Sequence, residues 1–115
     1  MDNCIFCKIV KKELPSEIVY ESDNVIAFRD VAPVAPNHIL VIPKEHVESL
    51  SDLDDEKRKN FLPEIFGSIN ELVSKENLME DGYRVVTNCG KDGGQTVGHL
   101  HFHLLGGRGM QWPPG

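Results

Sequence analysis

Apolar residues recur every three or four positions in two stretches of the chain, as they do on one face of a helix. The first stretch predicts a short helix over residues 4–13, followed by Pro15. The second follows capping residues at 51–55 and predicts a helix of about five or six turns. Pro63 lies within the first two turns of this pattern, so a late start of the helix is possible. The members of its apolar stripe are Phe61, Ile65, Ile69 and Val73.

Short runs of β-branched or alternating residues predict strands. These runs cover residues 18–21, 25–29, 38–42, 83–88 and 99–105. The cluster Ser22-Asp23-Asn24 between the first two runs is typical of a hairpin turn. A short helix, strands, one long helix and further strands indicate an α+β fold with an antiparallel sheet. The glycine- and proline-rich residues 106–115 should lack regular structure.

Composition limits the class of protein. The 115 residues, 40% hydrophobic and 26% charged, predict one globular domain over residues 1–115. No apolar run approaches the roughly 18 residues that cross a bilayer, and the N-terminus has no apolar export segment. We therefore expect no membrane association and a reducing, cytoplasmic location. A net charge of −6 argues against binding a nucleic acid polymer, although one small anion remains possible.

Three of the five histidines lie within one predicted strand, at His99, His101 and His103. Strand alternation would place them on one face, each about 6.6–6.8 Å from the next. Histidine serves as nucleophile, proton donor or metal ligand near neutral pH. The spacing alone does not choose between metal and phosphate chemistry.

The loop before these histidines favours phosphate. Gly93 and Gly94 allow backbone N–H groups to approach an oxyanion closely, and Gln95 and Thr96 add side-chain donors. Together with the histidines, this loop suggests a phosphate cradle beside a nucleophile.

The segment Gly-Gly-Gln-Thr-Val-Gly-His-Leu-His-Phe-His-Leu-Leu-Gly-Gly-Arg, residues 93–108, resembles the histidine triad motif. Residues 28–33, 35–38 and 41–44 and the final Trp-Pro-Pro-Gly extend the resemblance nearly end to end. The chain is similar to the histidine triad nucleotide-binding branch, whose members are purine nucleoside phosphoramidases. The resemblance implies a five-stranded antiparallel sheet with one long and one short helix. It also implies a homodimer with a ten-stranded sheet, in which the tail near Trp112 reaches the partner's active site.

The resemblance assigns the catalytic roles. His101 would attack the α-phosphorus of a nucleoside 5′-phosphoramidate and form a nucleotidyl-histidine, which water then cleaves. A backbone carbonyl is the expected partner of its other ring nitrogen. His103 and His38 would line the phosphate site. Thr96 would bond the leaving group or a phosphate oxygen.

The nucleotide would be held by polar and apolar residues. Asp30 would accept hydrogen bonds from the ribose hydroxyls. Asn88, Gly94 and Gln95 would complete the polar wall. The apolar slot for a purine base would consist of Ile5, Phe6, Phe28, Val31 and Leu40.

Cys4 and Cys7 stand in C-x-x-C spacing, which alone is a weak sign of a metal site. Some members of the resembled family bind zinc through two cysteines, a histidine after the third strand and the first triad histidine. The ligands here would be Cys4, Cys7, His46 and His99, a closed Cys₂His₂ set typical of structural Zn²⁺. His99 would then be unavailable to phosphate and would fix the register that aims His101. Cys89 has no partner at motif spacing.

Three alternatives remain at this point. The protein could be a nucleotide-binding regulator whose hydrolysis is incidental, or a diadenosine polyphosphate hydrolase. It could also be a zinc hydrolase in which the three strand histidines hold a catalytic metal with an open position for water.

Overall fold

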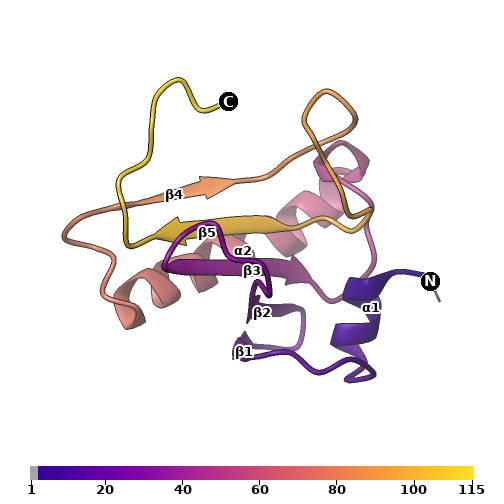
Figure 1. Cartoon of the computed structure of the whole chain (residues 1–115). Coiled ribbons are helices and arrows are strands. Elements are labelled where there is room, and N and C mark those ends of the chain that lie inside the picture. Colours follow the sequence, from indigo (N-terminus) through magenta and orange to yellow (C-terminus); the bar gives the residue numbers. More distant parts are fainter. Residues whose placement is uncertain (1–2) are drawn as a thin grey trace.

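A computed structural model describes residues 3–115. In this part of the chain, five strands form one antiparallel sheet in the order β1-β2-β3-β5-β4 (Figure 1). The predicted α+β fold is confirmed, with one short and one long helix. The elements in chain order are α1 (Ile5–Val10), β1 (Ile18–Glu21), β2 (Val25–Arg29), β3 (Asn37–Pro43), a 3₁₀ helix (Leu50–Asp52), α2 (Asp55–Lys75), β4 (Tyr83–Val86) and β5 (Phe102–Gly106).

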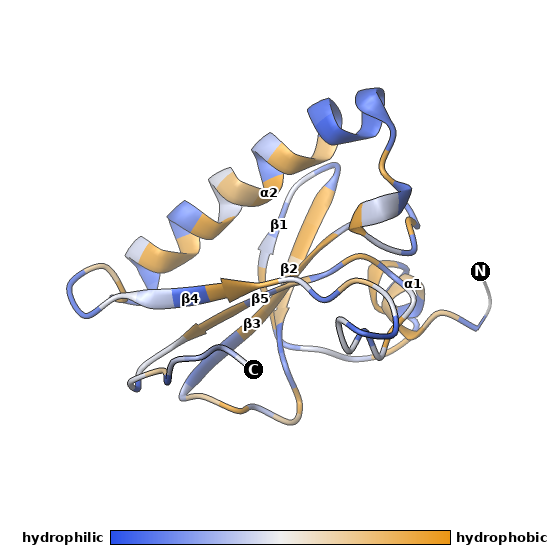
Figure 2. Cartoon of the chain, turned by 90° about the horizontal axis from the view of Figure 1, so that it is seen from above, coloured by the Kyte–Doolittle hydropathy of each residue, from blue (hydrophilic) through white to orange (hydrophobic). Residues whose placement is uncertain are grey.

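The two helices cover opposite faces of the sheet (Figure 2). Val25 and Ala27 of β2 pack with the apolar stripe of α2, which includes Ile65 and Ile69. Ile26 and Phe28, which alternate with them, pack with α1. The central strands are therefore buried on both sides. β5 sends Phe102 and Leu104 toward α2, so His103 between them faces the side of the sheet that carries α1.

The long helix begins at Asp55 and continues through Pro63, so the late start that the proline allowed does not occur. Asp54 caps the helix by accepting a hydrogen bond from the backbone N–H of Lys57 at 2.8 Å. Pro63 lies on the exposed side of α2, where water can solvate the carbonyl that its missing N–H leaves unpaired. No helix in residues 3–115 has the length and hydropathy needed to cross a membrane.

The last two strands are shorter than predicted. β4 ends at Val86, because the Thr87 hydroxyl then donates to the carbonyl of His101 at 2.8 Å in place of a ladder bond. The N–H of Leu100 donates to the carbonyl of Val47 at 2.6 Å, which holds this segment outside the sheet. β5 therefore starts at Phe102, and His103 alone of the three histidines lies within the strand. The tail after β5 has no helix or strand among its described residues, as predicted.

Candidate functional site: two histidine clusters that share a strand entry

The first cluster joins two cysteines to two histidines. Cys4 and Cys7 come from the start of α1, His46 from the segment after β3, and His99 from the approach to β5. Nδ1 of His99 lies 3.3 Å from Sγ of Cys4 and 3.6 Å from Sγ of Cys7. Nδ1 of His46 lies 3.2 Å from Sγ of Cys7. All four ligand atoms lie within 4.8 Å of one another.

These separations fit a tetrahedral zinc ion. Zn–S and Zn–N bonds of about 2.3 and 2.0–2.1 Å place neighbouring ligand atoms roughly 3.3–3.8 Å apart. The Nε2 proton of His99 is donated to the carbonyl of Pro43 at 2.8 Å, which leaves the Nδ1 lone pair for a metal. Burial lowers the pKa of His99 to about 4, so the neutral form that binds metal is favoured. The donor set predicted from the sequence therefore suits Zn²⁺.

The second cluster contains His101. Its Nδ1 lies 2.7 Å from the carbonyl oxygen of His99. Because a carbonyl only accepts hydrogen bonds, Nδ1 carries the proton and Nε2 keeps its lone pair. The ring is 4% exposed and lies edge-on to Phe6, with centroids 5.2 Å apart. The backbone carbonyl expected to partner the other ring nitrogen of His101 is thus present.

His38 and His103 complete this second cluster. The N–H of Val34 donates to Nδ1 of His38 at 3.1 Å. Nε2 of His38 lies 2.9 Å from Nδ1 of His103 and 3.4 Å from Oδ2 of Asp30. Burial lowers the pKa of His103 to about 4, and the nearby His101 and His38 act in the same direction. The ring centroids of His101 and His103 are 5.0 Å apart, so these two imidazoles share one site.

The three strand histidines do not converge on a single point. His99 contributes its side chain to the cysteine cluster and only its carbonyl to His101. Leu100, Phe102 and Leu104 pack on the α2 side and the three imidazoles lie on the α1 side, as the predicted alternation requires, although only His103 falls within β5. A catalytic metal held by all three histidines does not match the ligand groups found in residues 3–115.

The polar loop residues form hydrogen bonds within the loop and to the backbone of Glu48. The side-chain amide of Gln95 donates to the carbonyls of Glu48 and Val97 at 2.6 and 2.9 Å and accepts from the N–H of Gly90 at 3.0 Å. Asn88 donates to the carbonyl of Gly93 at 2.6 Å. Gly94 has φ of +76°, which favours glycine. Their predicted contacts with a nucleotide remain predictions.

The predicted base slot is divided in this structure. Phe6, Phe28 and Leu40 are buried together on the α1 side of the sheet. Ile5 is 49% exposed and Val31 is 94% exposed, so both are available to a ligand at the edge of that core.

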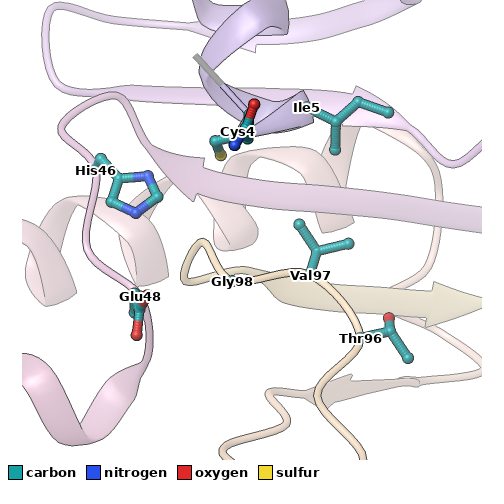
Figure 3. A pocket seen from close by; sticks show the side chains of 8 residues that line it. Cys4, Ile5, His46, Glu48, Thr96, Val97 and Gly98 are labelled. Atoms are coloured by element: carbon teal, nitrogen blue, oxygen red, sulfur yellow. The ribbon is translucent and has the colours of Figure 1, made fainter. Parts of the chain in front are cut away.

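A surface hollow of about 730 Å³ lies against the first cluster (Figure 3). Cys4, His46 and Thr96 line it, together with Asn3, Ile5, Glu48, Val97 and Gly98. A second hollow of about 500 Å³ shares Glu48, Thr96 and Gly98 with it. Thr96 is thus exposed to open space beside the first cluster, and neither His101 nor His103 lines these two hollows.

Sequence reasoning placed Phe6 in the base slot but missed its contact with the histidines, and it missed Val34 altogether. Phe6 packs edge-on against both His99 and His101, with centroids 6.0 and 5.2 Å away. Its place in an apolar helix stripe gave no sign of this double contact. Val34 contributes only its backbone N–H, which nearly every residue type carries, so nothing in the sequence indicated this role.

Comparison with known proteins agrees with this geometry. The family model described as the HIT domain matches residues 11–110. The chain is 50% identical over 114 residues to an uncharacterized HIT-like protein of Synechococcus elongatus, covering 99% of this chain and 98% of that protein. It is 51% identical over 114 residues to the 14 kDa zinc-binding protein of Zea mays, covering 96% and 87%. The crystal structure of a HIT family hydrolase from Legionella pneumophila superposes with a TM-score of 0.94 at 48% identity, over 98% of this chain and 100% of that one. The chain belongs to the HIT family.

Proposed function

We propose that this protein is a purine nucleoside phosphoramidase that releases a nucleoside 5′-monophosphate and an amine through a nucleotidyl-histidine intermediate. The observation that carries the proposal is the hydrogen bond from Nδ1 of His101 to the carbonyl of His99, 2.7 Å long. It leaves the ring neutral with an unprotonated Nε2, and this is the form in which imidazole attacks phosphorus. His103 stands beside it on the same side of the sheet.

In the first step, Nε2 of His101 attacks the α-phosphorus and a P–Nε2 bond forms. The P–N bond to the amine breaks, and its electron pair stays on the amine nitrogen, which takes up a proton from solvent and departs. The imidazole of His101 becomes cationic as it bonds to phosphorus. The carbonyl dipole of His99, already aligned on Nδ1–H, stabilises that charge.

In the second step, water attacks phosphorus from the opposite side. The P–Nε2 bond breaks, its electrons return to His101, and water loses one proton to solvent as the nucleoside monophosphate forms. His103 donates to the non-bridging oxygens in both steps, where charge is greatest during displacement. The hydroxyl of Thr96, an exposed residue of the loop that leads into the histidine segment, bonds the leaving group.

The remaining substrate contacts follow the chemistry of a nucleoside. Asp30 accepts hydrogen bonds from the ribose hydroxyls through the carboxylate that also lies near His38. The purine lies between exposed Ile5 and Val31 and the buried edge of Phe28. Asn88, Gly94 and Gln95 shape the polar wall beside the phosphate.

We further infer that Zn²⁺ occupies the Cys4, Cys7, His46 and His99 cluster and is structural. Its four protein ligands leave no open position for water. When bound, the ion ties α1 to the entry of β5, and the protein residues alone carry the reaction. We also propose a cytoplasmic location, where Cys4 and Cys7 stay reduced and able to bind the ion.

The protein is proposed to act as a homodimer. β4 lies at one edge of the sheet, and Tyr83 on it is 44% exposed. Pairing of two such edges would give a ten-stranded sheet and place Trp112, which is 80% exposed, near the second copy. Light scattering should give twice the monomer mass, whereas a monomer would contradict this part of the proposal.

The test compares turnover with binding. His101→Ala should abolish hydrolysis of an adenosine 5′-phosphoramidate, while calorimetry still detects binding of adenosine monophosphate. The control variant Lys75→Ala removes an exposed cation on α2 and should keep wild-type rates. Undiminished turnover by His101→Ala would refute the mechanism.

Two other functions are outcomes of the same assay. A higher rate on diadenosine polyphosphates than on phosphoramidates would identify a dinucleotide hydrolase. Binding of nucleotide without turnover of either substrate class would indicate a regulator.

A further inference from the structure

We propose that the backbone amide of Val34 determines, through His38, which nitrogen of His103 carries its proton, and that Arg108 holds this amide in place. We call this chain of hydrogen bonds, from Val34 through His38 to His103, the relay. Its importance for catalysis rests on the proposed function, in which His103 must present an N–H donor to phosphate. The relay itself is a property of the folded chain and can be tested without substrate.

His38 has no ring nitrogen left over for a ligand. Its Nδ1 accepts from the N–H of Val34 at 3.1 Å, and a backbone N–H can only donate. The proton of the neutral ring is therefore on Nε2, 2.9 Å from Nδ1 of His103. Only 6% of His38 is exposed. His38 is thus a positioning residue, not the direct phosphate contact that the sequence suggested.

The consequence for His103 is a single tautomer. Since His38 donates to Nδ1 of His103, the proton of His103 must be on Nε2. Burial lowers the pKa of both rings, so both are neutral near pH 7 and tautomers decide where the donors lie. His101 has the opposite arrangement, with Nδ1 protonated and Nε2 free. Adjacent rings thus present one lone pair and one N–H donor, as in-line attack on a phosphoryl group requires.

The segment after β5 holds the loop that carries Val34. Nε of Arg108 donates to the carbonyl of Val34 at 2.9 Å. Gly107, with φ of +93°, brings the backbone so close to Pro36 that an added Cβ would lie 2.8 Å from its ring. The side chain of Val34 is 59% exposed, so its packing does little to fix the residue. Hydrogen bonds on both sides of Val34 must hold its amide against His38.

The same residues argue against a metal ion at this place. Ligand atoms of Asp30, His38 and His103 also lie within 4.8 Å of one another. A metal on Nε2 of His38 would require the ring proton on Nδ1, where the N–H of Val34 already points. Asp30 does not take this proton: its Oδ2 lies 3.4 Å from Nε2 of His38, farther than Nδ1 of His103, and its Oδ1 accepts from the N–H of Ala32. The hydrogen bonds of this cluster therefore fix which ring nitrogens carry protons.

The test reads tautomers directly. In the full-length, zinc-loaded protein with ¹⁵N-labelled histidine, long-range ¹H–¹⁵N spectra distinguish Nδ1–H from Nε2–H rings. His38 and His103 should be Nε2–H and His101 should be Nδ1–H in the same spectrum. A wild-type His103 protonated on Nδ1 would overturn the relay, whatever the activity.

Variants of His38 separate positioning from direct contact. His38→Gln places an amide nitrogen near the position of Nε2 and should keep the Nε2–H tautomer of His103. His38→Asn can reach Val34 but not His103, so His103 should show mixed tautomers. The kcat of the asparagine variant should be about ten-fold below that of the glutamine variant, with KM within about two-fold, as expected for one lost hydrogen bond. An unchanged His103 tautomer in His38→Asn would overturn the role of His38.

Variants of Arg108 test the anchor and remain informative if the His38 variants fail to fold. Arg108→Ala should give mixed His103 tautomers and about three-fold lower kcat, and Arg108→Lys should restore both. Lys75→Ala, which removes another cation-to-carbonyl contact far from the site, should change neither. A normal His103 tautomer in Arg108→Ala would overturn the anchor. If the tautomers are as stated but phosphoramidates are not hydrolysed, the relay stands and the proposed function fails.

Discussion

The carbonyl oxygen of His99 lies 2.7 Å from Nδ1 of His101, while the imidazole of His99 points into the cysteine cluster. One residue therefore belongs to both clusters, with its side chain in the cysteine cluster and its backbone carbonyl on His101, the proposed nucleophile. A backbone shift at His99 would move its carbonyl and with it the ring of His101. Under the proposed function, this contact would link the metal site to catalysis.

Loss of zinc should therefore lower both stability and activity. Cys7→Ser removes a buried ligand and should reduce zinc content, lower Tm by several degrees and reduce kcat, since His99 loses its anchor. Metal analysis, calorimetry and turnover measure these effects. Cys89→Ser is the matched control, because Cys89 lies outside the cluster. Equal zinc content in the two variants would contradict the ligand assignment.

Acid should destabilise the protein through His103. Its folded-state pKa is about 4, below the ordinary 6.5, because burial disfavours the charged ring. The unfolded chain therefore binds the proton first as pH falls. The contribution of His103 to stability is complete above pH 6.5 and declines between pH 6.5 and 4. Urea unfolding across this range should show a smaller decline for His103→Asn than for the wild type, and equal declines would refute the assignment.

Asp30 accepts a hydrogen bond from the backbone of Ala32 and is proposed to bind the ribose hydroxyls, and substitutions test the second role. Asp30→Asn keeps an oxygen for the N–H of Ala32, which now donates to Oδ1 at 2.8 Å, but removes the charge that attracts ribose hydroxyls. Asp30→Ala removes both. Both variants should weaken adenosine monophosphate binding about ten-fold or more, as for a charge-assisted hydrogen bond. A 2′,3′-dideoxy nucleotide should bind wild type and Asp30→Asn alike, and an equal loss for that ligand would argue against a ribose contact.

The Gln95 amide should be needed for the shape of the glycine loop. Gln95→Glu replaces the N–H donor facing the carbonyls of Glu48 and Val97 with a carboxylate oxygen. The variant should be destabilised by about 1–3 kcal/mol, because two acceptors lose their donor and meet a like-signed group. Gln95→Ala, which removes the donor without adding repulsion, should lose less. Chemical denaturation measures both, and a glutamate variant as stable as the wild type would refute this role.

The fold and much of the site follow from local patterns in the sequence. Apolar residues spaced four positions apart predicted α2. Alternation around Phe102 and Leu104 correctly predicted which face of β5 lies in the core. The family resemblance added His46 and His99 to the C-x-x-C pair, and the structure brings the ligand atoms of all four residues together.

The features that the sequence did not predict depend on contacts that backbone groups make with distant parts of the chain. The bond from Leu100 to Val47 removes His99 from the strand, and the amide of Val34 acts regardless of side chain. Neither partner is encoded by residue type or spacing. The position of Pro63 within α2 likewise depends on which side of the helix solvent reaches.

The most direct test of the central claim is to locate the covalent intermediate. The protein is mixed with an adenosine 5′-phosphoramidate, quenched within one turnover under conditions that preserve P–N bonds, digested and mapped by mass spectrometry. The account predicts a nucleotidyl group on His101 that is absent in His101→Ala. An adduct on His103, or turnover without any histidine adduct, would contradict it.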